Sequence, residues 1–197
     1  RPSARVGRDA EFARMREAWD ALQTIFVSGP PGIGKSRLLR DFAAQGPYRL
    51  FEGRPGDSGL PYASQARFFR ELLRPLDALE PWVLLELARI LPELGSAPEA
   101  IQTERERLRL FEAMAWVLRR LARAEPLVLV LDDLHFFDAE SLAAQRYLYS
   151  SLLAEPGLNI RMLFGFRSGE LPEDVLRGIG SLVGAGRALH LELSPLD

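Results

Sequence analysis

TIFVSGPPGIGKS, residues 24–36, is the stretch that decides the fold of this chain. Its first five residues are apolar or small and predict a short buried strand. The next eight, residues 29–36, satisfy the pattern G-x-x-x-x-G-K-S/T at every fixed position. The sequence KSRLLRDFAA, which begins at Lys35, repeats apolar residues at helical spacing. A strand, a glycine-rich turn and a helix in this order predict a loop that binds phosphate groups.

Each fixed position of this loop has a chemical reason. Glycines let the backbone approach phosphates closely and direct N–H groups inward, and the start of the helix adds a partial positive charge. Lys35 is expected to reach the β- and γ-phosphates, and the Ser36 hydroxyl to bind Mg²⁺. The predicted nucleotide-binding residues of the loop are Gly29, Pro30, Gly32, Ile33, Gly34, Lys35, Ser36 and Arg37.

Lysine usage supports this interpretation. Of the 25 basic residues, 24 are arginine, and the only lysine is Lys35. A lysine is a compact point charge on a flexible stem, whereas an arginine is a planar fork. Guanine-specific P-loop proteins grip the base with an N/T-K-x-D motif, which would need a second lysine. We therefore expect the nucleotide to be an adenine nucleotide, ATP or ADP.

The bulk composition is that of a water-soluble globular chain. It has 197 residues, a net charge of −2 and no cysteine, so a disulfide framework and a thiolate metal site are excluded. No basic excess points to direct nucleic-acid binding, and no apolar run is long enough for a membrane span. Without a secretory signal we expect a cytoplasmic protein. The abrupt ends suggest an excerpt of a longer multidomain protein.

A second informative stretch is LVLVLDDLHFFD, residues 127–138, in which a buried strand ends in adjacent acids. Tandem carboxylates at the mouth of an apolar strand require a nearby cation. Asp132 is expected to hold Mg²⁺ together with Ser36, and Asp133 either orients the attacking water or caps a turn. Asp138 is expected to cap the next helix. His135 either senses the γ-phosphate or packs in the loop.

Helices and strands alternate along the chain. The strands are nearly continuously apolar, which predicts a parallel sheet covered on both faces. Strands are expected at residues 24–28, 48–53, 127–132, 160–166 and 188–193. Helices are expected at residues 9–22 with Asp9 as a possible cap, then 35–44, 62–73, 99–124, 138–153 and 172–179. The proline-rich region between the third and fourth of these helices is not assigned to definite elements.

The stretch DDLHFFD, residues 132–138, resembles the D-D-L/V/A-H-W-A-D segment of the signal-transducing (STAND) P-loop ATPases. The similar branch is that of large bacterial ATP-binding transcription regulators of the LuxR/MalT or SARP type. Phe136 stands where the family has tryptophan, and Phe137 where it has a small residue. Other segments match in order: VGRDAEF (6–12), GLPYASQARFFRELL (59–73), LFGFRSGEL (163–171) and LHLELSPLD (189–197).

This resemblance implies a three-layer α/β P-loop NTPase fold of the ASCE/AAA-like kind, with a central mostly parallel sheet flanked by helices. Residues 1–197 would form one ATPase core domain. The resemblance implies that Val6, Gly7 and Arg8 wrap the adenine and that Arg167 senses phosphate. From the residues alone, the alternative is that Gly7 is only a turn glycine and that Arg8 is a solvated charge. The expected catalytic residues are thus Lys35, Asp133 and Arg167.

The implied function is an ATP·Mg²⁺-binding, slowly hydrolysing switch in a signal-transducing regulator, with covalently linked lid, sensor and output domains outside this chain. Nucleotide-dependent oligomerisation fits such a switch. One alternative is an AAA+ motor or loader acting in a ring, for which no arginine finger is identified. Another is a small P-loop kinase, against which the tandem acids and the lack of an acceptor-binding motif argue.

Overall fold

The computed structural model describes residues 7–74, 76 and 78–195. The chain forms two compact units. The sheet unit comprises residues 1–53, 128–135 and 161–197, and the helical unit comprises residues 54–127 and 136–160. Each unit has its own internal packing and is described by itself.

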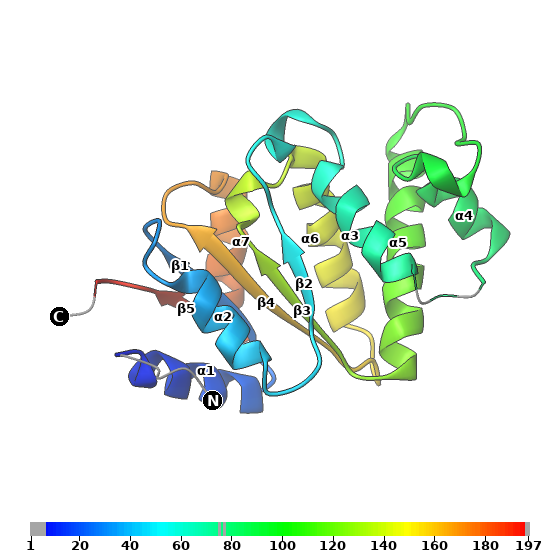
Figure 1. Cartoon of the computed structure of the whole chain (residues 1–197). Helices are drawn as coiled ribbons and strands as arrows, with labels where there is room; N and C mark the ends of the chain where they lie inside the picture. Colours follow the sequence, from blue (N-terminus) through cyan, green and yellow to red (C-terminus); the bar gives the residue numbers. More distant parts are fainter. Residues whose placement is uncertain (1–6, 75, 77, 196–197) are drawn as a thin grey trace. The chain divides into compact units, whose positions relative to one another are not determined.

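The sheet unit is built on five parallel strands in the order β2-β3-β4-β1-β5 (Figure 1). Only the first residues of β3 and β4 fall in the helical unit. The strands are β1 (Thr24–Gly29), β2 (Arg49–Glu52), β3 (Leu127–Asp132), β4 (Ile160–Arg167) and β5 (Ala188–Glu192). Since the strands are parallel, their carboxyl ends meet at one edge, where β1 continues into the phosphate loop.

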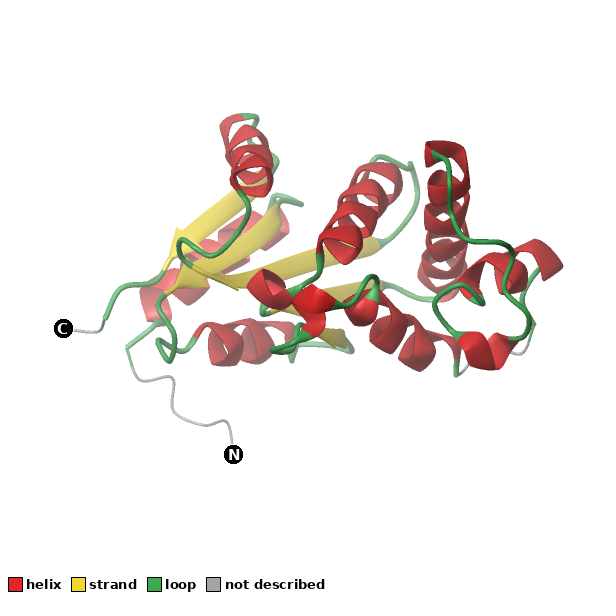
Figure 2. Ribbon diagram, turned by 90° about the horizontal axis from the view of Figure 1, so that it is seen from above, coloured by secondary structure: helices red, strands yellow, loops and turns green. Residues whose placement is uncertain are grey.

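Helices of this unit cover both faces of the sheet. Helices α1 (Asp9–Asp20) and α2 (Lys35–Ala43) lie on one face and α7 (Glu173–Gly184) on the other (Figures 1 and 2). The alternation of β1 decides which side chains meet which helix. Ile25 and Val27 join the core beneath α1 and α2, whereas Phe26 stacks on Phe164 at a centroid distance of 4.9 Å. The predicted three-layer α/β fold is confirmed.

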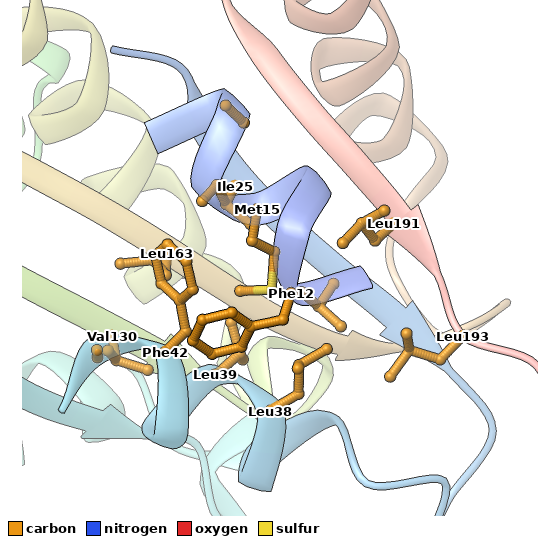
Figure 3. Close-up of a cluster of buried hydrophobic side chains, with 13 residues drawn as sticks. Phe12, Met15, Ile25, Leu38, Leu39, Phe42, Val130, Leu163, Leu191 and Leu193 are labelled. Carbon is orange, nitrogen blue, oxygen red and sulfur yellow. The ribbon is translucent and has the colours of Figure 1, made fainter. Parts of the chain in front are cut away.

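The core beneath α1 and α2 is a cluster of aliphatic and aromatic side chains (Figure 3). Phe12 and Met15 of α1 meet Leu39 and Phe42 of α2, and the rings of Phe12 and Phe42 lie edge to face at 5.1 Å. Leu163 of β4 belongs to the same cluster. Burial of these side chains stabilises the junction of β1 and α2, which positions the phosphate loop.

The helical unit is an all-helical body. Its α-helices are α3 (Ala63–Leu73), α4 (Pro81–Leu87), α5 (Glu104–Ala124) and α6 (Ala139–Leu153). Short 3₁₀ turns lie at Asp57–Gly59 and Pro92–Leu94, and a third, Leu134–Phe136, follows β3. No helix among the described residues is long and apolar enough to cross a membrane.

One predicted helix start and one predicted helix cap are wrong. The helix expected from residue 99 begins at Glu104, because Thr103 and Glu106 form a capping box. The Thr103 hydroxyl accepts from the Glu106 N–H at 3.2 Å, and the Glu106 carboxylate accepts from the Thr103 N–H at 3.0 Å. Asp9 is the first residue of α1 rather than its cap, since Arg8 occupies the cap position without a side-chain cap bond.

The predicted cap of α6 is confirmed, whereas the predicted end of the last helix is too early. Asp138 caps α6 as predicted, its carboxylate accepting from the Ser141 N–H at 2.9 Å. The last helix runs five residues beyond its predicted end, to Gly184. Its two internal glycines do not stop it, because a glycine in a helix weakens the helix without breaking it.

Candidate nucleotide-phosphate site

The loop between β1 and α2 has the backbone that its glycines allow. Gly32 has φ 76° and Gly34 has φ 101°, both in the left-handed region that side-chain-bearing residues rarely adopt. Gly34 occupies the cap position of α2, so the helix begins at Lys35. The predicted loop residues therefore lie together between the end of one strand and the start of one helix.

Lys35 is nearly buried, with 6% of its surface exposed. Its Nζ donates to the carbonyl oxygens of Gly29 at 3.0 Å and Pro30 at 2.7 Å. Burial lowers the pKa of the ammonium, and the charge of Asp133 opposes that shift. The carbonyl bonds compensate the buried charge and hold the amine within its own loop. In this position the lysine is the cationic group of the site.

Asp132, at the end of β3, is fully buried at 0% exposure. Its Oδ1 accepts from the Asp133 N–H at 2.9 Å. Its Oδ2 is buried and has no hydrogen-bond partner within the described part of the chain. A buried carboxylate oxygen without a donor is costly unless a cation or water completes it.

Gly165 makes room for the Asp132 side chain. A Cβ at Gly165 would lie 2.6 Å from Asp132 Oδ1 and 2.6 Å from Leu39 Cδ1. The bare backbone of β4 thus lets the carboxylate and the α2 side chain meet above the strand. Sequence reasoning did not single out this glycine. The available signal was an isolated glycine inside the apolar strand sequence LFGFR, which marks close approach of another group.

A third acid, Glu52, joins the tandem pair. One carboxylate oxygen from each of Glu52, Asp132 and Asp133 lies within 4.8 Å of the others. Glu52 is aligned with Asp132 in the β2–β3 pairing. Sequence reasoning missed Glu52, because only the strand order places the end of β2 beside the end of β3.

Asp133 has a left-handed backbone conformation, which is uncommon for a residue with a Cβ. Its φ is 53°, in the left-handed region, and such strain in a residue with a Cβ is often found at functional sites. Burial raises the pKa of its carboxyl group, and the neighbouring charges of Asp132 and Glu52 raise it further. A carboxyl group with a raised pKa and close to Lys35 is suited to accept a proton or to orient water.

His135 links the acidic turn to the end of β4. Its Nδ1 accepts from the Arg167 N–H at 3.1 Å, so the neutral ring carries its proton on Nε2. Nε2 lies 3.9 Å from Asp133 Oδ1 and 3.9 Å from Glu170 Oε2. Burial and the charge of Arg167 lower the pKa of the ring, which favours its neutral form at neutral pH.

Arg167 lies at the carboxyl edge of the sheet, as the sequence predicted. It is aligned with Gly29 in the β1–β4 pairing, and the Ser168 N–H donates to the Gly29 carbonyl at 3.2 Å. The Arg167 guanidinium lies 3.7 Å from Glu170. Its charge acts on both Lys35 and Asp133. Arg167, Asp132 and Asp133 therefore belong to the same electrostatic site as Lys35.

Arg8 joins three segments of the sheet unit. Its guanidinium donates to the Ser194 carbonyl at 2.7 Å, to the Ile33 carbonyl at 3.5 Å and to Glu11 at 2.8 Å. Arg8 is therefore held between the tip of the phosphate loop and the segment after β5, rather than simply solvated. Gly7 has φ 83°, as a turn glycine does. Val6 lies outside the described residues.

The remaining sequence candidates are less closely tied to the site. Arg37 is mostly exposed and forms an ion pair with Asp41, at 3.6 Å within the same helix. His190 is a residue of β5, as predicted, and its Nε2 lies 2.7 Å from the Ser28 hydroxyl. That pair joins β5 to β1 just before the phosphate loop.

The residues present fit the phosphate groups of a nucleotide and a Mg²⁺ ion in their donor chemistry. Mg²⁺ prefers carboxylate, hydroxyl and phosphate oxygens. The unpartnered Oδ2 of Asp132 and the hydroxyl of Ser36 are such donors. The loop backbone and Lys35 supply the groups that bind phosphate oxygens.

Comparison with known proteins gives one family match and several structural likenesses. A family model described as an AAA ATPase domain matches residues 5–162. Comparison with the sequences of curated proteins gives no match. The chain spans about half the length of several solved proteins that it resembles. It covers 52%, 47% and 47% of the length of three of them.

Two solved structures have a TM-score of 0.54. Cdc6p from Pyrobaculum aerophilum is 17% identical, with 98% of this chain and 47% of that protein covered. The ORC2 protein of Aeropyrum pernix, solved as ADPNP and ADP complexes, is 14% identical, with 98% and 48% covered. A STAND protein with a tetratricopeptide repeat sensor from Pyrococcus horikoshii is 17% identical at a TM-score of 0.49, with 98% and 24% covered. At identities of 17% and 14%, the likeness to the Cdc6p and ORC2 structures shows the fold alone.

Proposed function

Because the chain belongs to the AAA ATPase domain family, we propose that it binds ATP with Mg²⁺ and hydrolyses it slowly, as a nucleotide-dependent switch. The observation that carries the proposal is the presence of two buried ionisable side chains, Lys35 and Asp132, at one edge of the sheet. Lys35 lies within the phosphate loop, and Asp132 carries a buried oxygen without a hydrogen-bond donor. The charges of the two residues act on each other.

The proposed roles follow from the position of each group. The loop N–H groups and Lys35 bind the phosphates, and Ser36 and Asp132 hold the cation. Mg²⁺, when bound, neutralises phosphate charge. Asp133 orients the attacking water and accepts its proton, helped by its raised pKa. Arg167 faces the same edge and stabilises the charge that develops on the phosphate.

In the proposed switch, His135 connects Asp133 to the end of strand β4. Its ring accepts from the Arg167 backbone and lies 3.9 Å from Asp133. If a change at the γ-phosphate moves Asp133, His135 would transmit that movement to the backbone at the end of β4. Arg8 is the second path, since its guanidinium bonds both the Ile33 and the Ser194 carbonyls. Such connections convert a local charge change into movement of a segment.

The wider proposal concerns a regulator that contains this domain. We infer that the domain serves signal transduction in a bacterial transcription regulator of the STAND class, in the cytoplasm. Support comes from the DDLHFFD and VGRDAEF segments together. The same proposal includes linked lid, sensor and output domains and nucleotide-dependent self-association. Adenine is the proposed base, because the chain offers no second lysine for a guanine-binding motif.

A binding titration tests this function. Lys35→Ala is expected to reduce ATP·Mg²⁺ affinity by at least about 100-fold, because charge-assisted bonds of this kind each contribute about 1.5–3 kcal/mol and the loop loses its buried cation. The measurement is isothermal calorimetry of the 197-residue chain. Arg14→Ala, which removes an exposed cation of α1, is the matched control and is expected to bind as the wild type does. Equal ATP affinity in the Lys35 and Arg14 variants would contradict the proposed site.

A further inference from the structure

Glu52 gives the acidic edge one more carboxylate than the roles above require. It ends β2, beside Asp132, and its carboxylate lies within the same 4.8 Å cluster as those of Asp132 and Asp133. Three carboxylates so close repel one another, and a cation bound among them would offset that repulsion in addition to the nearby charges of Lys35 and Arg167. One of the three, Asp132, is fully buried and has an oxygen without a donor in the described part of the chain.

We propose that Glu52, Asp132 and Asp133 form a site that binds a hard divalent cation in the absence of nucleotide. This site shares Asp132 with the proposed function and rests on it to that extent. In the nucleotide-bound state, phosphate oxygens complete the cation's shell. In the absence of nucleotide, the Glu52 carboxylate supplies an oxygen ligand in place of a phosphate oxygen. The cation therefore binds without the nucleotide.

The spacing of the three acids fits one ion. Oxygen ligands lie about 2.3–2.6 Å from Ca²⁺ and about 2.0–2.1 Å from Mg²⁺. Opposite ligands of a Ca²⁺-sized ion are therefore roughly 4.6–5.2 Å apart, and those of Mg²⁺ roughly 4.0–4.2 Å. The three carboxylate oxygens lie within 4.8 Å of one another, which is close enough for all three to reach one ion of this class.

Arg40 influences the affinity of this site for a cation. Its guanidinium, on α2, forms an ion pair with one oxygen of Glu52. The pair is partly exposed, with 41% and 38% of the two side chains accessible, so water screens it. The arginine neutralises part of the charge that would attract a cation. Removing Glu52 and removing Arg40 should therefore change cation affinity in opposite directions.

The test uses Mn²⁺ as the probe, with free Mn²⁺ followed by electron paramagnetic resonance. The 197-residue chain is freed of nucleotide and metal with a chelator, and its absorbance confirms that no nucleotide remains. We expect the wild type to bind one Mn²⁺ with a Kd of about 10⁻⁴–10⁻³ M, the range of weak carboxylate sites. Glu52→Gln is expected to weaken binding on the order of tenfold, since ligand charge sets affinity.

Two variants complete the design. Arg40→Gln is expected to tighten Mn²⁺ binding several-fold, and Glu17→Gln, an exposed acid of α1, to leave it unchanged. A wild type that binds no Mn²⁺ without nucleotide, or a Glu52 or Arg40 variant that behaves like Glu17→Gln, overturns the inference. ATP·Mg²⁺ binding that persists in that case leaves the proposed function standing. Loss of ATP binding with intact Mn²⁺ binding would contradict the proposed function and leave the cation site standing.

Discussion

Replacing Gly165 by alanine tests how the sheet positions the Asp132 carboxylate. The new Cβ would lie 2.6 Å from both Asp132 Oδ1 and Leu39 Cδ1, where carbon and oxygen atoms need more than 3 Å. Neither neighbour can retreat easily, because both are fully buried and Asp132 Oδ1 is bonded to the Asp133 N–H. Overpacking of this kind costs about 1–3 kcal/mol. For a chain of this size, the apparent melting temperature should fall by about 2–4 °C per kcal/mol.

The control is a second glycine-to-alanine change in the same unit. Gly180 lies within α7, and a Cβ there would have no atom within 4 Å. Alanine in a helix interior is favoured over glycine by about 0.5–1 kcal/mol, so Gly180→Ala should raise the melting temperature. Thermal unfolding followed by circular dichroism measures both. A Gly165→Ala protein that melts at or above the wild-type temperature would refute the close approach of Asp132 across β4.

Two further predictions concern the nucleotide. Asp133→Asn should keep ATP affinity within about threefold while lowering kcat by about 10²-fold or more, because general-base catalysis contributes about 10²–10⁴-fold; full turnover in a phosphate-release assay would assign Asp133 to the turn instead. GTP should bind more weakly than ATP in a competition titration, because the chain lacks the lysine of a guanine-binding motif; equal affinities would remove the basis for adenine specificity.

Local patterns in the sequence were enough for the class of the protein. The prediction of an AAA-like P-loop ATPase domain is confirmed by the family match over residues 5–162. The phosphate-loop pattern was readable because strand, turn and helix are contiguous there. Element ends were less predictable, as at Thr103, because side-chain caps decide where a helix begins.

The residues that surround Asp132 show where sequence reasoning stopped. Gly165 and Glu52 lie far from Asp132 along the chain, and no local pattern links either residue to Asp132. Their relevance depends on strand order, which brings β2 and β4 to either side of β3. A pattern within one segment contains no information on which strand will be its neighbour.

The sequence by itself determined the phosphate loop, the single lysine within it and the acid that ends the β3 strand. These follow from local rules of backbone freedom, charge and periodicity. Only the tertiary structure decided that Glu52 joins the tandem acids and that a bare glycine makes space for Asp132. It also decided that His135 bonds the Arg167 backbone. The physical reason is that parallel strands gather their carboxyl ends at one edge in an order that the chain does not spell out locally.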